Sequence, residues 1–389
     1  MKKNLTLRYT VQQCAYWAAA AGVVSFATAF LLEQGFAASR IGILLASGNL
    51  LSCAAQPVLA SVADRIGGNI VKWFIVGLTA VSMACFISIQ LLPSSVGLYG
   101  LIYLLGVFTL DAMNPLLNAV SVSYNRIGYK INYGVGRGIG SFAYAVSALV
   151  IGKVMAAFGA HWMIWIALAL LALNVAATLG YPGLTEGVTE KTKRSECCSV
   201  PVFFRRYKWY CVSLLGVMLL AMFHAMTENY LIEVVSPLGG DSGTVGVALF
   251  VATAIEMVVI VNFDWLRTKV SDSCLLKFAG LSFILKSVLF IMAKNVIAIY
   301  GIQLLQATSY SFLSPTQLYY ADSKVSPADM VKGQAFITAA YTLGCAIGNF
   351  TGGQLLDAFN VRVLLYAGVA MAVSGTAVFF LTVDKKDKT

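Results

Sequence analysis

The feature that most constrains this chain is a series of apolar stretches, each about 20 residues long, which is the length that spans the hydrocarbon core of a bilayer as one helix. A helix satisfies its backbone hydrogen bonds internally, so such stretches fold stably in lipid. Only 11% of the 389 residues are charged, against about 25% in an average soluble domain. The sequence therefore predicts an all-α membrane protein. The twelve expected transmembrane helices lie near residues 9–31, 41–62, 72–92, 97–122, 132–157, 161–181, 209–235, 245–266, 275–292, 296–320, 332–357 and 361–383.

Lysine and arginine are unevenly distributed over the loops between these stretches. If both termini lie inside, only Arg40, Lys153, Lys294 and Arg362 fall on the outer side, which agrees with the positive-inside rule. We therefore expect a multi-pass protein of the plasma (inner) membrane with both termini cytoplasmic. The topology explains the net charge of +10, so no nucleic-acid partner is expected. No cysteine falls in an expected outer loop, which argues against a disulfide framework.

The chain divides into two six-helix halves. We expect an N-terminal bundle at 1–182, a polar and basic cytoplasmic linker at 183–208, and a C-terminal bundle at 209–389. A weak internal repeat supports duplication, because the glycine and tyrosine of the fifth helix recur in the eleventh, where glutamine replaces arginine. The matched residues are Gly136, Arg137 and Tyr144 with Gly333, Gln334 and Tyr341. Two pseudo-symmetric bundles of this kind are typical of secondary transporters.

The loop after the second helix carries Asp64, Arg65 and Gly67 in the sequence Ala-Ser-Val-Ala-Asp-Arg-Ile-Gly. This loop resembles the Gly-x-Leu-Ala-Asp-Arg-x-Gly-Arg-Lys signature of the major facilitator superfamily, with alanine in place of the leading glycine. The resemblance extends over the whole chain through the twelve spans, the central linker and the half-repeat. It implies the superfamily fold and a gating role for Asp64 and Arg65. The alternative is that these charges only set the topology.

Polar side chains follow one face of the fourth helix. Asp111, Asn114 and Asn118 recur at helical spacing. Arg137 lies inside the fifth helix among glycines, and a charge at bilayer depth usually has a partner and marks a pathway. We expect Asp111 to pair with Arg137, and the glycine pairs 134/138 and 136/140 both to allow close helix packing. The alternative is a purely structural ion pair.

The second half carries its own deep charges. His224 and Glu228 lie one helical turn apart on the seventh helix, and we expect Glu256 on the eighth helix to pair with Lys286 on the ninth. The deep acids then outnumber the deep bases by one. A buried carboxylate without a cation is most stable when protonated, so one of Glu256, Glu228 and Asp111, with Lys286, is expected to couple transport to protons.

Amides, hydroxyls and aromatic rings dominate the remaining polar faces. Gln306 lies on the tenth helix, and Gln334 and Tyr341 lie on the eleventh. With both deep cations paired to acids, such a lining favours a neutral, hydroxyl-rich ligand. The expected substrate-binding residues are Asp111, Asn114, Asn118, Arg137, Tyr144, His224, Glu228, Glu256, Gln306, Gln334 and Tyr341.

The fifth helix also resembles that of the oligosaccharide:proton symporter branch, which includes lactose permease. The resemblance implies that Arg137 and Tyr144 take the places of its sugar-binding arginine and tryptophan, and that Glu256 and Lys286 match its charges on helices eight and nine. The branch's helix-four glutamate falls at Asn118, and its proton-handling residues on helix ten fall at residues that do not titrate. The resemblance is therefore distant.

The sequence thus predicts a monomeric secondary transporter that imports a small neutral polar solute, sugar-like or nucleoside-like, with protons, or alternatively sodium, as the coupling ion. Its expected partners are that solute, the ion and the lipid bilayer; no cofactor or metal is expected. The first alternative is proton-antiport efflux of drugs or metabolites, although the fifth helix lacks the Gly-Pro-rich pattern of such antiporters. A membrane enzyme or a non-transporting sensor is a remote alternative, since two isolated histidines form no catalytic or metal-binding pattern.

Overall fold

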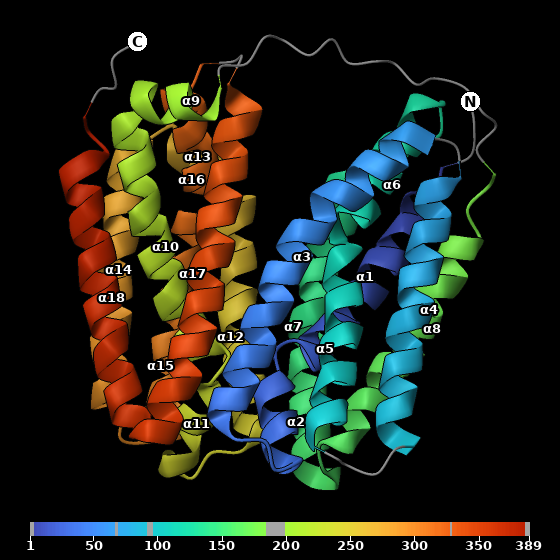
Figure 1. The fold of residues 1–389 in the computed structure, drawn as a ribbon, viewed down its shortest axis with the longest axis horizontal. Coiled ribbons are helices and arrows are strands. Elements are labelled where there is room, and N and C mark those ends of the chain that lie inside the picture. Colours follow the sequence, from blue (N-terminus) through green and yellow to red (C-terminus); the bar gives the residue numbers. More distant parts are fainter. Residues whose placement is uncertain (1–3, 67–68, 92–95, 184–198, 327–328, 386–389) are drawn as a thin grey trace. The chain divides into compact units, whose positions relative to one another are not determined.

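The computed structural model describes residues 4–66, 69–91, 96–183, 199–326 and 329–385, and every regular element in those ranges is helical (Figure 1). The elements are α1 (Thr6–Val23), α2 (Ala27–Glu33), α3 (Ala38–Ile66), α4 (Ile70–Leu91), α5 (Val96–Ala112), α6 (Asn114–Arg126), α7 (Tyr133–Phe158), α8 (His161–Leu179), α9 (Val200–Arg206), α10 (Lys208–Glu228), α11 (Leu231–Val235), η1 (Ser236–Leu238), α12 (Ser242–Val261), α13 (Phe263–Arg267), α14 (Asp272–Met292), α15 (Val296–Gln303), η2 (Leu304–Ala307), α16 (Tyr310–Lys324), α17 (Met330–Ala358) and α18 (Val361–Thr382).

The predicted spans all coincide with helices or with consecutive helical pieces. Within the described ranges, ten helices are long and apolar enough to cross a membrane, or 11 if α1 and α2, which are bent by 43°, form one broken span. The expected span at 332–357 is α17, which is 29 residues long. The all-α prediction is therefore confirmed.

The described residues form two compact units. Unit 1 comprises Met1–Lys191 and Asp241–Thr253, and unit 2 comprises Thr192–Gly240 and Ala254–Thr389. The first part of α12 therefore groups with unit 1, where Gly246 lies against Gly152 of α7. Most of the expected linker, 184–198, lies outside the described residues, and the boundaries at 182 and 208 stay a prediction.

Helix packing follows the same order in both units. In unit 1, α1 packs mainly on α7 and α8, and in unit 2, α10 packs mainly on α17 and α18. These are the first, fifth and sixth helices of each expected half. The shared pattern agrees with the duplication inferred from the sequence.

Small residues allow the closest of these contacts. A Cβ atom added at Gly136 would overlap the ring of Tyr9, and one added at Gly348 would lie 2.5 Å from the carbonyl oxygen of Met222. Gly348 thus lets α17 approach α10 closely. On α7 the pair 136/140 allows close packing as expected, whereas the pair 134/138 does not, because a Cβ at Gly138 would have no neighbour within 4 Å.

Several spans are interrupted near their polar residues. The fourth span breaks at Met113, between α5 and α6, where Pro115 lies in the first turn of the new helix, a position that requires no N–H donor. The tenth span changes to a 3₁₀ turn, η2, between α15 and α16. Such turns inside a helix often mark hinges or functional sites.

Candidate functional site

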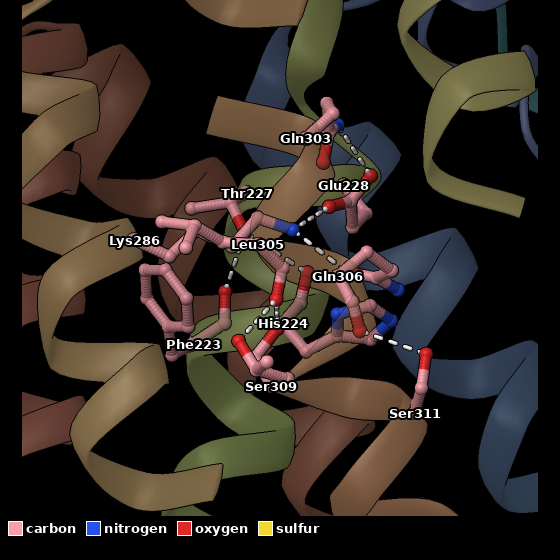
Figure 2. Close-up of polar contacts among 11 residues, drawn as sticks. Phe223, His224, Thr227, Glu228, Lys286, Gln303, Leu305, Gln306, Ser309 and Ser311 are labelled. Carbon is pink, nitrogen blue, oxygen red and sulfur yellow. Dashed lines mark hydrogen bonds and ion pairs between the residues drawn. The ribbon is translucent and has the colours of Figure 1, made fainter. Parts of the chain in front are cut away.

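A network of charged and amide groups in unit 2 joins α10, α14 and the interrupted tenth span. The ammonium group of Lys286 donates to Oε1 of Glu228 and to Oε1 of Gln306, each at 2.8 Å. Nε2 of Gln303 donates to the other carboxylate oxygen of Glu228 at 3.2 Å. Figure 2 shows the lysine nitrogen directed at Glu228, with Gln303 on the far side of the carboxylate. We call these four residues the Lys286 network.

Burial explains why the Lys286 network has this composition. The Lys286 side chain has no exposed surface, and that of Glu228 is 12% exposed. An isolated charge in such surroundings is strongly unfavourable, so it requires both a counter-charge and hydrogen bonds for its remaining donors. The carboxylate supplies the first, and Gln306, which is held in the η2 turn, supplies a second acceptor.

The predicted pairing of Lys286 with Glu256 is wrong. Lys286 pairs with Glu228, because α10 presents that carboxylate directly to α14. Glu256 is half-buried on α12 and lies within electrostatic range of Tyr310.

His224 adjoins the Lys286 network, one turn before Glu228 on α10. Its imidazole stacks on the ring of Tyr310, with centroids 4.6 Å apart and planes at 8°, and meets Phe283 edge-on. The ring of Tyr341 lies 6.2 Å beyond Tyr310. These contacts bring four of the predicted residues of the second half, His224, Glu228, Gln306 and Tyr341, into one neighbourhood.

Two polar atoms of this neighbourhood have unused hydrogen-bonding capacity. Nδ1 of His224 and Oε1 of Gln303 are buried and have no hydrogen-bond partner in the part of the chain that the structure describes. Buried polar atoms in native proteins are usually satisfied, and exceptions call for an explanation. A polar solute could provide the missing partners.

A second cluster, in unit 1, surrounds Arg137 on α7. Its guanidinium carbon lies 4.0 Å from the ring centroid of Trp17 on α1, and its Nη1 donates to Ser141 at 2.5 Å. Within the described ranges no carboxylate forms an ion pair with Arg137. The predicted pair with Asp111 is therefore wrong, because an indole face occupies the position expected for an acid. We call Arg137, Ser141, Trp17 and Tyr144 the Arg137 cluster.

Hydrogen bonds along α1 hold the indole in place. Nε1 of Trp17 donates to Oε1 of Gln13 at 3.0 Å, and Nε2 of Gln13 donates to the hydroxyl of Tyr9 at 2.9 Å. Gly140 leaves room for this arrangement, because a Cβ there would lie 3.0 Å from Cδ1 of Trp17. The close α1–α7 packing therefore fixes the surface on which the guanidinium rests.

Tyr144 completes the Arg137 cluster. Its ring meets Trp17 edge-on at 6.5 Å, and its hydroxyl lies 2.5 Å from the hydroxyl of Ser25, in the turn between α1 and α2. The structure thus brings Arg137 and Tyr144 together through Trp17, as two aromatic rings beside one cation.

Asp111 lies in the last turn of α5, within the candidate membrane span Leu98–Asn125. Its carboxylate makes no ion pair or hydrogen bond with the described residues; Gln56 bonds only to its backbone oxygen. Tyr16 of α1, fully buried, lies within electrostatic range of both Asp111 and Arg137. Asn114 begins α6, and Asn118 in the same helix has a buried Oδ1 with no hydrogen-bond partner among the residues that the structure describes.

The remaining predicted residues lie elsewhere. Gln334 donates from Nε2 to Oδ1 of Asp322 at 3.4 Å, away from the Lys286 network. Asp64 and Arg65 fall near the end of α3, but their side chains lie outside the described part of the chain. No group of three His, Cys, Asp or Glu residues that could hold a metal ion occurs among the described residues.

In unit 2, the side chains at the loop between α13 and α14 lie within the described part of the chain. Arg267 makes a bidentate pair with Asp272, at 2.9 and 3.2 Å, and its guanidinium covers the ring of Tyr319. Asp264 accepts a hydrogen bond from the Tyr319 hydroxyl. The hydrogen bonds to Asp272 raise the pKa of Arg267 above its ordinary value.

Sequence reasoning missed the partners of Arg137. Ser141 is one turn along the same helix face, so the spacing could have identified it. Trp17 is an aromatic residue of the first helix, and no signal in the sequence indicates that its ring lies beneath the guanidinium of Arg137.

Comparison with known proteins gives one family and a set of similar folds. The model of the MFS_1 like family matches residues 7–367. None of the curated proteins matches the sequence. Among solved structures, a mutant of the nucleoside transporter NupG is 14% identical with a TM-score of 0.84, covering 97% of this chain and 100% of that one. A second NupG structure is 15% identical with a TM-score of 0.76, covering 98% and 97%.

A bacterial homologue of the human lysosomal transporter Spinster, inward-facing and unoccupied, is 14% identical with a TM-score of 0.71, covering 98% of this chain and 95% of that one. At these identities the similarities concern the fold.

Proposed function

The chain belongs to the MFS_1 like family of the major facilitator superfamily, and from that premise we propose that it imports a small polar solute by alternating access, coupled to protons. A multi-pass membrane transporter is what the family and the helices indicate. The solute, the coupling ion and the direction are the proposed part.

The main support for proton coupling is that the Asp111 carboxylate forms no ion pair or hydrogen bond with the described residues. A carboxylate within a membrane-crossing helix that is bonded to neither a cation nor a donor among the described residues is not fixed in its ionised form, so it can take up a proton. Glu228, in contrast, is held by Lys286 and Gln303. Of the predicted coupling residues, Asp111 is therefore the one we propose to take up and release the proton. Glu256 is the second candidate.

The polar neighbourhoods support a solute rich in hydrogen-bonding groups. In unit 2, the unsatisfied atoms of His224 and Gln303 beside the ring of Tyr310 suit a ring-containing solute of sugar-like or nucleoside-like type. In unit 1, taken by itself, the rings of Trp17 and Tyr144 suit the same kind of solute. A neutral solute is expected if each deep cation, Arg137 and Lys286, has an acid partner. Among the described residues Lys286 has one and Arg137 does not, so the reason to expect a neutral solute is removed.

We place the protein in the plasma (inner) membrane as a monomer with both termini cytoplasmic, and we keep Asp64 and Arg65 as the proposed gate. The deciding experiment measures solute uptake into proteoliposomes whose outside is more acidic than their inside, first without sodium and then with sodium. Accumulation that follows the pH gradient supports proton symport. Expulsion of solute under the same gradient would support the alternative, proton-antiport efflux.

A further inference from the structure

Arg137 has more hydrogen-bonding capacity than unit 1 uses. A guanidinium carries five N–H donors, and within the described part of the chain that of Arg137 makes one hydrogen bond, to Ser141, and lies on the face of Trp17. The side chain is half-buried, and within the described ranges no acid pairs with it. The planar guanidinium lies on the indole ring of Trp17, and its remaining N–H donors can bind both oxygens of a carboxylate.

The charges of Arg137 and Asp111 in unit 1 also favour an anionic solute. Arg137 and Asp111 both lie within electrostatic range of Tyr16, and they do not form an ion pair with each other. When no solute is bound and Asp111 is ionised, the two charges cancel. If a neutral solute and a proton entered together, a net positive charge would remain at membrane depth, which is unfavourable. If a monoanion and a proton entered together, the net charge would again be zero.

We infer that the solute carries one carboxylate group, which binds to the guanidinium of Arg137 while its ring or chain lies against Trp17 and Tyr144. This inference rests on the proposed function and narrows its substrate class to monocarboxylates, such as sugar acids or aromatic acids. A phosphate monoester fits less well, because at neutral pH it carries about −1.5 to −2 charges and would leave an excess of negative charge.

The same electrostatics makes the coupling strict. Loading the anion alone gives the Arg137–Asp111 site an excess negative charge, and loading the proton alone gives it an excess positive charge. Either half-loaded state is unfavourable in a medium of low polarity, whereas the empty and fully loaded states are balanced. Anion–proton symport by this site is therefore electroneutral.

The test uses purified full-length protein and matched pairs of solutes that differ in one acidic group: glucuronate with glucose, benzoate with benzamide, and uridine monophosphate with uridine. Ligand-induced thermal stabilisation reports binding, and proteoliposome uptake reports transport. We expect a carboxylate to bind better than its neutral partner. We expect Arg137→Gln to weaken that carboxylate at least about tenfold, as for loss of a hydrogen bond to a charged group, and Arg137→Lys to have a smaller effect.

The matched control is Lys153→Gln, which removes an exposed cation from the same helix and should leave binding unchanged. Uptake of the carboxylate should follow the pH gradient and be insensitive to an imposed membrane potential. A protein that binds a neutral member as well as its acid, with Arg137→Gln neutral in effect, would overturn the inference and leave the proposed transport intact. A protein that binds a carboxylate through Arg137 but moves no solute would overturn the transport proposal and support the binding site.

Discussion

The ammonium nitrogen of Lys286 lies 2.8 Å from Oε1 of Glu228, and the lysine side chain has no exposed surface. The pair joins α14 to α10, and it satisfies a charge that neither helix could bury alone. Gln306 provides a further acceptor, also at 2.8 Å, and thereby ties the η2 turn to the pair. The stability of unit 2 should therefore depend on this contact.

Removing the acid from the Lys286 network should destabilise the protein more than removing both charges. Glu228→Gln leaves a buried ammonium group without an anion, which typically costs about 3–5 kcal/mol. The double variant Glu228→Gln with Lys286→Gln keeps hydrogen-bonding groups but no charge, and should recover a large part of that loss. Denaturant unfolding in mixed micelles measures both. Equal stability of Glu228→Gln and the wild type would contradict the importance of the pair.

Asp111→Asn should uncouple transport from protons. The amide has nearly the shape of the protonated acid but cannot release a proton, so the variant is fixed in the loaded state of the proposed coupling site. We expect loss of accumulation driven by a pH gradient and retention of solute exchange between equal pools. Asp384→Asn, which breaks only a surface pair with Lys277, is the control and should accumulate solute normally. Normal accumulation by Asp111→Asn would contradict proton coupling by Asp111 and favour Glu256, the second candidate.

Two glycines on different helices should respond oppositely to substitution by alanine. A Cβ at Gly348 would meet the backbone of Met222 at 2.5–3.1 Å, and backbone cannot move aside cheaply. Overpacking of this kind typically costs about 1–3 kcal/mol. A Cβ at Gly138 would meet nothing within 4 Å, and alanine in a helix is favoured over glycine by roughly 0.5–1 kcal/mol. Thermal unfolding should show Gly348→Ala below the wild type and Gly138→Ala at or above it.

The helices are predictable because length and hydropathy alone define a span, whereas these two properties do not locate the break at Met113 or the 3₁₀ turn at Leu304–Ala307. Deep charges were likewise visible in the sequence, but their partners were not. Depth along a helix can be read from the sequence, and the order in which helices surround one another cannot. For this reason the sequence favours Glu256 as the partner of Lys286, although α10 brings Glu228 to that position.

The same limitation explains Arg137, for which an acid on the preceding helix was expected. The α1–α7 contact instead presents the face of Trp17, since Gly136 and Gly140 let the two helices approach closely. A cation–π contact leaves no charge pattern in the sequence, and only the fold reveals it.

Trp17 should position Arg137 for its ligand, so its replacement should weaken binding and leave the fold intact. A cation–π contact contributes about 0.5–2 kcal/mol depending on its exposure, which predicts that Trp17→Leu raises the Kd of an Arg137-dependent solute roughly two- to thirtyfold. Trp17→Phe keeps a ring but loses the hydrogen bond to Gln13, so it should lie between Trp17→Leu and the wild type. Trp165→Leu, which alters an exposed indole on α8, is the matched control. If Trp17→Leu and Trp165→Leu bound the solute equally well, the guanidinium would be positioned by Ser141 alone.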